Sequence, residues 1–267
     1  MSPRSAPAAR FDVREFARTV QGSHRGELEL AAISAAGLDA EAARLARVLR
    51  AVERVTLQRM RNLLVTATHK DARVTAFLTS WAFERFWVAD ALDAVLEAAG
   101  VDDAPLTGPP RRRAAERAER RGPVRRAIAG MLAGPQLVAA HVTAGLVDEW
   151  IRQAAYRRLA EAAEVLSGAA ARILALGDRH IAFLGEEAER RLGAGGRAVS
   201  LTRTELARQA WPVGAVELPD AERTFFESFV FGTPAGRAEA ARIAERVAAL
   251  PGLGPAPGAT ILARLAP

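Results

Sequence analysis

Apolar residues recur at helical spacing over most of the chain. In the stretch 40–68, Leu45, Leu49 and Val52 follow one another at intervals of three or four residues, which places their side chains on one face of a helix. Asp39 precedes this run and can cap its first turn with its carboxylate. The pattern therefore predicts a long helix over 40–68.

Three more long helices are predicted by the same spacing and by their end signals. Two of them cover 71–99 and 135–166, and the Ser-Gly pair at 167–168 then reverses the chain into the last, which ends near 193. Short joints make the first two helices one antiparallel hairpin and the last two another. The hairpins are separated by an irregular stretch, 100–134, that is interrupted by prolines and glycines. Such a crossover runs the length of a bundle, so the second and third helices are expected to be parallel.

This order of elements predicts an all-α fold: an antiparallel four-helix bundle with a long crossover and with helical appendages at both ends. The chain divides into an N-terminal helical segment, 1–38, the bundle, 39–195, and a C-terminal helical cap, 196–267. Asp12 is expected to cap a short helix in the first segment. The Gly/Pro-rich stretch 251–257 is expected to be a loosely attached tail.

Composition supports the helical prediction and restricts the chemistry. Ala, Leu, Arg and Glu dominate, whereas residues that favour strands are few, so little or no sheet is expected. The absence of cysteine excludes thiolate metal sites, iron–sulfur clusters and a cysteine nucleophile. The motifs of nucleotide-binding proteins and of common hydrolases are missing from the sequence. The first ten residues lack the apolar run of a secretory signal, so a cytoplasmic location is expected.

One uncharged stretch and one charged cluster raise the question of contacts with membranes or nucleic acid. The stretch 127–147 is long enough to span a bilayer, but its glycines and His141 favour packing within the protein. The formal charge of +6 and the eight arginines between Arg111 and Arg126 could attract phosphates or acidic lipid. Lys70 is the only lysine, however, so nearly every positive charge is an arginine. Such a preference for Arg over Lys is typical of codon usage in a GC-rich, bacterial genome. No aromatic residue is interleaved with the arginines to stack on bases, so neither nucleic acid nor a membrane is the expected partner.

Acidic residues fall at interior positions of the first three bundle helices. Glu53, Glu84 and Glu149 each share a helix face with apolar or aromatic residues, among them Trp81 and Tyr156. A carboxylate so placed needs a partner or a metal ion, or its pKa must rise. All three are therefore candidate ligands.

The fourth helix carries a stretch that resembles a known family. Asp178-Arg179-His180-Ile181-Ala182-Phe183 is similar to the acidic-x-Arg-His-x-x-Phe stretch on the last bundle helix of ferritin-like proteins. The resemblance covers about 40–193 and implies the ferritin-like superfamily of di-iron carboxylate proteins, with iron as the cofactor and O2-using redox chemistry. The metal ligands that it implies here are Glu53, Glu84, Glu149 and His180.

The ligand set of that family is incomplete in this chain. Di-iron members supply a Glu from each of two helices and a Glu-x-x-His motif from each of the other two. Trp87 stands three residues after Glu84, where the motif has His, and Gly177 stands three residues before His180, where it has Glu. By helix rise, His180 and Glu149 are also expected to differ in height by about 10 Å.

Replacement ligands and metal-free partners are both available. Asp178 or Glu187 is a candidate for the missing carboxylate, and His141 is a candidate for the missing imidazole. Without a metal, the glutamates are expected to pair with arginines such as Arg85 or Arg152, and the histidine of the motif is then a hydrogen-bonded core residue.

Two functions are compatible with such a site. The favoured one is a non-catalytic, ferritin-like protein with an incomplete metal site, which binds a small apolar ligand inside the bundle or a protein on its faces. Trp81, Phe86 and Trp87 are then expected to pack where a cofactor would otherwise lie. The alternative is an iron-dependent, O2-using oxidoreductase that holds one or two ions in an altered carboxylate/His site. A homodimer fits either interpretation, and whether the chain is an enzyme stays open.

Overall fold

The computed structural model describes residues 10–102, 106 and 134–266. This part of the chain is helical and contains no β-strand, which confirms the all-α fold class. Most of the predicted crossover, 100–134, lies outside the described residues, and so does the arginine cluster from Arg111 to Arg126. The predictions about that stretch stay predictions.

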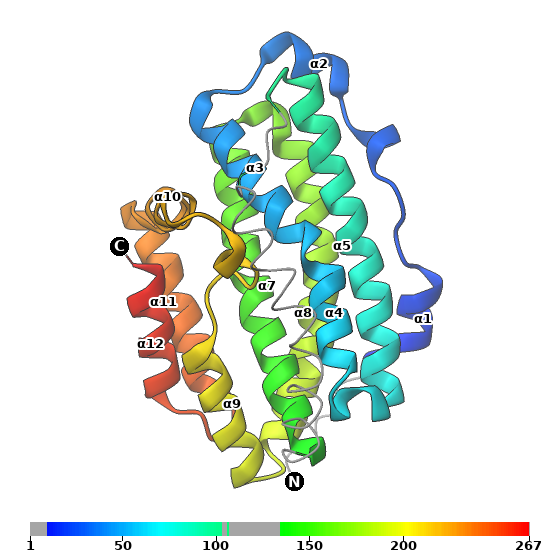
Figure 1. The fold of residues 1–267 in the computed structure, drawn as a ribbon, viewed down its shortest axis with the longest axis vertical. Coiled ribbons are helices and arrows are strands. Elements are labelled where there is room, and N and C mark those ends of the chain that lie inside the picture. The colour runs from blue at the N-terminus through cyan, green and yellow to red at the C-terminus, as the bar shows by residue number, and fades with distance from the viewer. Residues whose placement is uncertain (1–9, 103–105, 107–133, 267) are drawn as a thin grey trace, which may run out of the picture.

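Four columns of helix stand side by side in the main layer of the molecule (Figure 1). The first column is α3 (Ala40–Arg54) continued by α4 (Thr56–Leu64), and the others are α5 (Ala72–Ala98), α7 (Leu137–Ala162) and α8 (Ser167–Leu192). Helix α3 packs against α5 and α7, α5 also contacts α8, and α7 packs along α8. Side chains from all four columns can therefore meet between them.

Helices α5 and α7 run in the same direction. The short turn η2 (Ala67–Lys70), which precedes α5, contacts the turn η3 (Gly134–Gln136), which precedes α7. Both helices thus begin at the same end of the layer, the lower end in Figure 1. Helix α8 then returns antiparallel to α7 after the turn η4 (Glu164–Leu166).

The single helix predicted over 40–68 is in fact broken. Helix α3 ends at Arg54, α4 begins at Thr56, and η2 follows before α5. Val55 and Thr56 at the break are both β-branched, which lowers the local helix propensity. The C-terminal part of the chain also packs here, because a Cβ on Gly214 would lie 2.5 Å from a methyl carbon of Val55. Tertiary packing and weak local propensity together explain the break.

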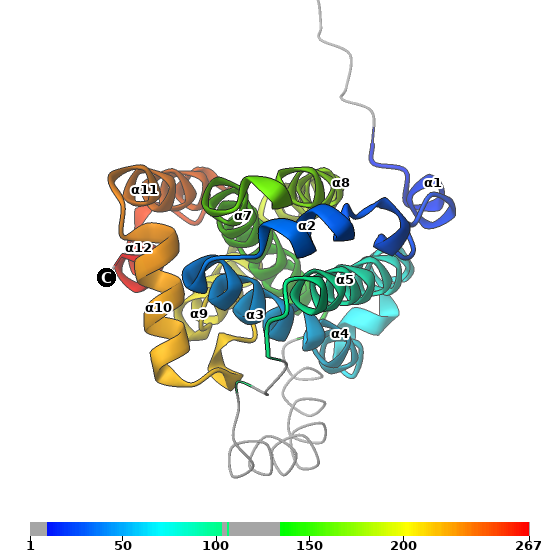
Figure 2. The same ribbon diagram turned by 90° about the horizontal axis from the view of Figure 1, so that it is seen from above.

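The N-terminal segment forms a belt along the outside of the main layer. It consists of α1 (Val13–Arg18), η1 (Arg25–Glu27) and α2 (Leu30–Ala36), and it contacts α5 (Figure 2). The Asp12 carboxylate accepts hydrogen bonds from two backbone N–H groups in the first turn of α1, which confirms the predicted cap. The belt covers the side of the layer on which α5 and α8 meet.

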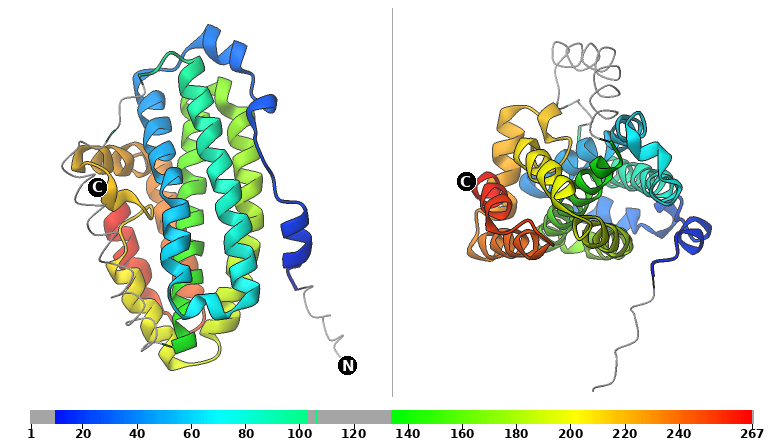
Figure 3. Two further views of the ribbon diagram at one scale, coloured as in Figure 1. Left: turned by 45° about the vertical axis from the view of Figure 1, so that its right-hand side comes forward. Right: turned by 90° about the horizontal axis from the view of Figure 1, so that it is seen from below.

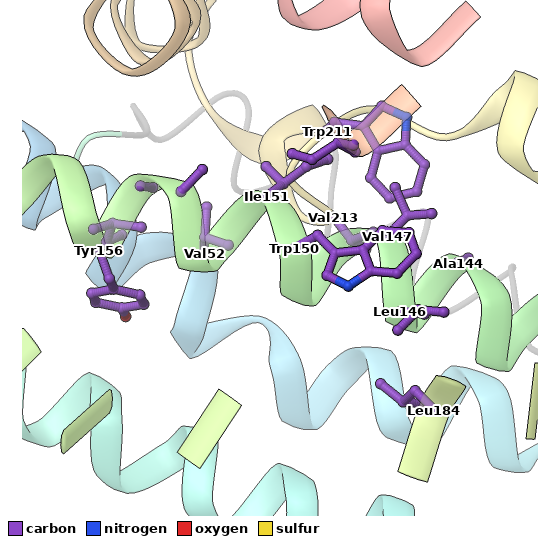
Figure 4. Close-up of a cluster of buried hydrophobic side chains, with 14 of the residues drawn as sticks. Val52, Ala144, Leu146, Val147, Trp150, Ile151, Tyr156, Leu184, Trp211 and Val213 are labelled. Atoms are coloured by element: carbon purple, nitrogen blue, oxygen red, sulfur yellow. The ribbon is translucent and has the colours of Figure 1, made fainter. Parts of the chain in front are cut away.

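The C-terminal helices form a second layer against α7. Helix α9 (Gly196–Arg208), α10 (Asp220–Phe231) and α11 (Pro234–Ala249) contact α7, and α12 (Pro255–Leu265) packs on α9 and α11. Trp211 and Val213, from the connection between α9 and α10, belong to the same buried cluster as Val147 and Ile151 of α7 (Figure 4).

The prediction of a loosely attached tail at 251–257 is wrong. Gly252 and Gly254 have positive φ angles of 73° and 65°, so the chain turns back on the protein there. Pro255 then begins α12, whose Ile261 is fully buried. A Cβ on Gly258 would lie 2.3 Å from the carbonyl oxygen of Ala244, so glycine permits the close contact between α12 and α11.

Helix α7 is the column of the main layer that faces the C-terminal layer, and both layers enclose it. Every residue from Val142 to Tyr156 is buried. Of the uncharged stretch 127–147 that was predicted to pack inside the protein, residues 138–140 and 142–147 are buried, whereas 127–133 lie outside the described residues. Within the described ranges, no helix combines the length and the apolar character needed to cross a membrane.

Replacing Ile261 tests whether α12 belongs to the packed core. We expect Ile261→Ala to lower the free energy of unfolding by about 2–4 kcal/mol, because it removes a fully buried side chain. Ala263→Ser, on the exposed side of the same helix, is the control and should change it by less than about 0.5 kcal/mol. Urea unfolding followed by circular dichroism measures both, and equal small effects would mean that α12 adds no packing.

Candidate functional site

The four side chains predicted as a site are all buried between the helix columns, and three of them are in contact. Glu53 of α3, Glu84 of α5, Glu149 of α7 and His180 of α8 are each at most 1% exposed. His180 Nε2 lies 2.7 Å from Glu84 Oε2, and His180 Nδ1 lies 3.4 Å from Glu149 Oε1. His180 therefore bridges carboxylates from two other helices.

The contact between His180 and Glu149 corrects the height difference of about 10 Å expected from the sequence. That difference followed from a chain reversal at the Ser-Gly pair, 167–168. The reversal is instead at η4 (Glu164–Leu166), and the pair forms the start of α8. Both side chains lie about 15 residues from the turn, or about 23 Å at 1.5 Å per residue, so they are level.

Arg85 of α5 occupies the centre of the site. It is 1% exposed, its Nη1 donates to Glu53 Oε1 at 3.2 Å, and its Nη2 donates to Glu149 Oε2. Trp81, one turn earlier on α5, donates its Nε1–H to Glu149 Oε1 at 2.8 Å. One guanidinium thus links carboxylates from two other columns, Glu53 of α3 and Glu149 of α7.

A second buried arginine extends the network toward the C-terminal layer. Arg152 Nη1 lies 2.6 Å from Glu53 Oε2, and Arg152 Nε donates to Asp148 Oδ2 at 3.0 Å. Asp148 also accepts a hydrogen bond from Arg59 Nη1 of α4 and one from the backbone N–H of Val213, each at 2.7 Å. The network therefore fixes both the broken first column and the segment after α9.

The charges of the network keep Glu149 ionised. Burial alone would raise the pKa of the Glu149 carboxyl, because a charged group loses hydration in the interior. Arg85 and His180 act in the opposite direction and outweigh burial, so the pKa lies below its ordinary value. The carboxylate is therefore ionised at neutral pH in the folded protein.

Arg152 and Tyr156 stay protonated for related reasons. Burial acts to lower the pKa of Arg152, but the negative charges of Asp148 and Glu53 outweigh it and raise that pKa. Burial and the neighbouring Glu53 raise the pKa of Tyr156 well above its ordinary value. The phenol therefore remains a donor, and it bonds to Glu53 Oε1 at 2.9 Å.

The N-terminal belt closes the site on the α5/α8 side. The backbone N–H of Gln21 donates to Glu84 Oε1 at 2.9 Å. Arg179 Nη1 lies 3.4 Å from the same oxygen, and Arg179 Nη2 donates to Thr19 Oγ1 at 2.8 Å. Glu84 is thus held by a histidine from inside and by the belt from outside.

Gly177 is explained by the packing of α8 on α7. A Cβ at this position would lie 3.2 Å from Gln153 Nε2 and 3.6 Å from Glu149 Oε2. A glutamate here, as in the di-iron pattern, would have to displace Gln153 and would bring a second negative charge beside Glu149. The position therefore suits close helix packing.

Trp87 lies on the flank of α5 and not in the site. It is half-buried, and its ring contacts those of Phe83 and Phe86 with centroids 6.1 and 5.3 Å away. Phe86 is exposed, so the expectation that Phe86 and Trp87 fill the interior is wrong. Only Trp81 of that group lies at the centre, because its spacing from Arg85 places both on the inner face of α5.

The candidate replacement ligands lie away from His180. Asp178 is exposed and accepts a hydrogen bond from Gln153 Nε2 at 2.6 Å. Glu187 is buried but lies about 10 Å further along α8, where it pairs with Arg73, Arg190 and Arg191. His141 Nδ1 lies 2.8 Å from Thr68 Oγ1, near the start of α7.

The donor set does not fit a di-iron centre. Four carboxylates, from Glu53, Glu84, Asp148 and Glu149, are matched by the guanidinium groups of Arg59, Arg85 and Arg152 and by His180, which is charged when protonated. The two nitrogens of His180 also point at different carboxylates, so these groups do not converge on one point. In the described part of the chain, no group of three or more His, Asp or Glu side chains could hold a metal ion.

Sequence reasoning missed Asp148 and Arg59. The sequence did contain a signal for Asp148, because Asp148 and Arg152 are oppositely charged and lie four residues apart on a buried helix. No sequence pattern indicated that the Arg59 side chain points inward, because its direction depends on the break in the helix at Val55.

Replacing Arg85 tests how much the ion-pair network contributes to the free energy of unfolding. We expect Arg85→Met to lower the free energy of unfolding by about 3–5 kcal/mol, because it leaves buried carboxylates without their partner. Adding Glu149→Gln should recover part of this loss by removing the unpaired charge. Arg54→Met, at a half-exposed arginine of α3, is the control and should cost about 1 kcal/mol or less in urea unfolding. Equal costs for Arg85→Met and Arg54→Met would contradict the central role of Arg85.

His141 should make the protein less stable in mild acid. Burial lowers its pKa to about 4, and Arg59 adds to the effect. Because the unfolded chain has the higher pKa, about 6.5, it binds the proton more tightly, and stability falls as the pH drops from about 6.5 toward 4. We expect the free energy of unfolding, measured with urea, to fall between pH 7 and pH 4.5 in the wild type. In His141→Asn this fall should be smaller by up to about 3 kcal/mol. His69→Asn, at an exposed histidine, is the control and should lose as much stability as the wild type between these pH values. The same pH dependence in all three proteins would show that His141 is not responsible for it.

Comparison with protein-family models, curated proteins and solved structures finds no match. The contacts of the chain itself therefore carry the functional argument.

Proposed function

We propose that this protein is a non-catalytic, protein-binding member of the ferritin-like architecture, in which an ion-pair network takes the place of the metal centre. The order of the elements supports the architecture: two antiparallel pairs of helix columns, with α5 parallel to α7. The sequence Asp178-Arg179-His180-Ile181-Ala182-Phe183 on α8 supports the same relationship.

The observation that carries the proposal is the position of Arg85. Its guanidinium contacts Glu53 and Glu149, two of the carboxylates that a di-iron member would offer to the metal. A guanidinium is charged at any physiological pH and cannot act as a ligand. A divalent ion at this point would meet a fixed positive charge in a medium of low dielectric constant. Arg85 therefore favours a centre that has a structural role.

The interior offers little room for a small apolar ligand. One pocket between the bundle helices is lined by residues that include Phe77, Trp81 and His141, and another by residues that include Tyr156 and Ile173. Each has room for only about one water molecule. Of the two kinds of binding expected from the sequence, binding of a protein on the outer surface is the better supported.

The second candidate function is an iron-dependent, O2-using oxidoreductase. The contacts of His180 with Glu84 and Glu149 favour it, since these are three of the four expected ligands. It requires Arg85 to leave Glu149 when the ion binds, and the buried guanidinium would then keep only Glu53 of its two carboxylate partners.

Metal analysis separates the two functions. Protein purified from iron-supplied cells should contain less than about 0.1 iron per chain by mass spectrometry, because Arg85 already compensates the carboxylates. Adding ferrous iron under O2 should give no more oxygen uptake than the same iron in buffer. About one or two irons per chain, lost in His180→Ala and kept in the exposed control His69→Ala, would overturn the proposal.

A further inference from the structure

The outer face of α5 differs from that of an ordinary surface helix. Between Arg73 and Asp90 the only charged residues of α5 are Glu84 and Arg85, and both are buried. Apolar residues therefore lie on all sides of this part of the helix, a pattern typical of helices that are buried all round. Figure 3 shows α5 at the front of the molecule, where no other described helix covers it.

Aromatic side chains occupy the centre of this face. Phe83 and Phe86 are 43% and 47% exposed, and Trp87 packs edge-on against both. The exposed Leu57 and Val65 of the neighbouring first column add to the apolar surface of the molecule. Large aromatic residues in contact with one another at the surface are typical of protein interfaces.

We propose that this face binds a second copy of the chain, with the two α5 helices antiparallel about a twofold axis near Phe83. In such a pair, residues equally far before and after Phe83 lie opposite each other. Phe86 then faces Ser80 of the second copy, and Trp87 faces Thr79. Large side chains on one half of the face meet small ones on the other half, which is the complementarity that close helix packing requires.

The charges at the two ends of α5 are complementary in the same arrangement. Lys70 precedes the helix, Glu97 lies in its last turn, and both are exposed. Within the described part of the chain, neither makes an ion pair. Lys70 lies thirteen residues before Phe83 and Glu97 fourteen after it, so the antiparallel pair brings Lys70 of each copy next to Glu97 of the other. Both ends of the interface then carry opposite charges, whereas parallel helices would place like charges together.

The proposed dimer deepens the proposed function by naming the protein partner as a second copy. It rests on that function only in the claim that the bundle binds a protein. The dimer and the metal-free centre can therefore fail separately, because iron content and oligomeric state are measured independently on one preparation.

Sedimentation equilibrium tests the aromatic face. The full-length wild type should sediment as a dimer at micromolar concentration. Phe83→Glu with Phe86→Glu should give a monomer with an unchanged helical circular dichroism spectrum, since both side chains are exposed. Val216→Glu, at an apolar residue that is 68% exposed outside α5, is the control and should remain a dimer. A wild-type monomer, or a dimer that survives the double substitution, would overturn the proposal.

Charge reversal tests the antiparallel register. Lys70→Glu alone places two glutamates at each end of the dimer, and Glu97→Lys alone places two lysines there, so each should raise the dimer Kd about tenfold or more. A mixture of the two variants should instead form a heterodimer with opposite charges at both ends and with a Kd near that of the wild type. A mixture that associates no better than either variant alone would refute the antiparallel arrangement.

Discussion

The contacts of Arg85 with Glu53 and Glu149 are the constraint on which the rest of the structure depends. Charges enclosed between helices must be compensated, because burial removes their hydration. From this centre, ion pairs and hydrogen bonds reach all four helix columns, the N-terminal belt and the segment after α9. His180 links Glu149 to Glu84 and so joins α8 to α5, and Glu84 in turn accepts the N–H of the N-terminal belt. In the other direction, Arg152 and Asp148 extend the network to the broken first column and to the segment after α9.

We infer that the network contributes more to the specificity of helix packing than to net stability. Well-packed apolar residues can replace a buried ion pair without loss, whereas removing one partner alone is costly. The network also demands one register, because sliding α7 by one turn relative to α8 would move Glu149 about 5 Å from His180. Apolar contacts between alanine-rich helices tolerate such shifts more easily, since many alternative registers bury similar area. We therefore interpret the centre as the feature that selects one packing of the helices, which leaves the outer surface of α5 available for binding.

The sequence predicted what depends on local pattern and burial. Helical periodicity indicated the long helices, the carboxylate of Asp12 indicated its cap, and the apolar neighbours of Glu53 and Glu149 indicated that these residues lie inside. Pairing of the glutamates with Arg85 or Arg152 was also predicted for a metal-free centre, because a buried carboxylate needs a cation.

Features set by tertiary contact could not be predicted from local pattern. Gly214, which packs against the break at Val55, is distant from it in sequence, and α12 packs closely on α11 at Gly258. Trp87 has the spacing of a ligand but lies on the flank of α5.

Whether Arg85 keeps the centre free of metal is decided by the state of the centre under conditions that favour metal binding. The decisive measurement is a crystal structure of the full chain, grown from protein made with excess iron, with diffraction data collected above and below the iron absorption edge. If the centre is metal-free, the map contains no anomalous peak between the helix columns, and the guanidinium of Arg85 is in contact with Glu53 and Glu149. An iron peak bound by Glu84, Glu149 and His180, with Arg85 displaced from Glu149, would contradict it.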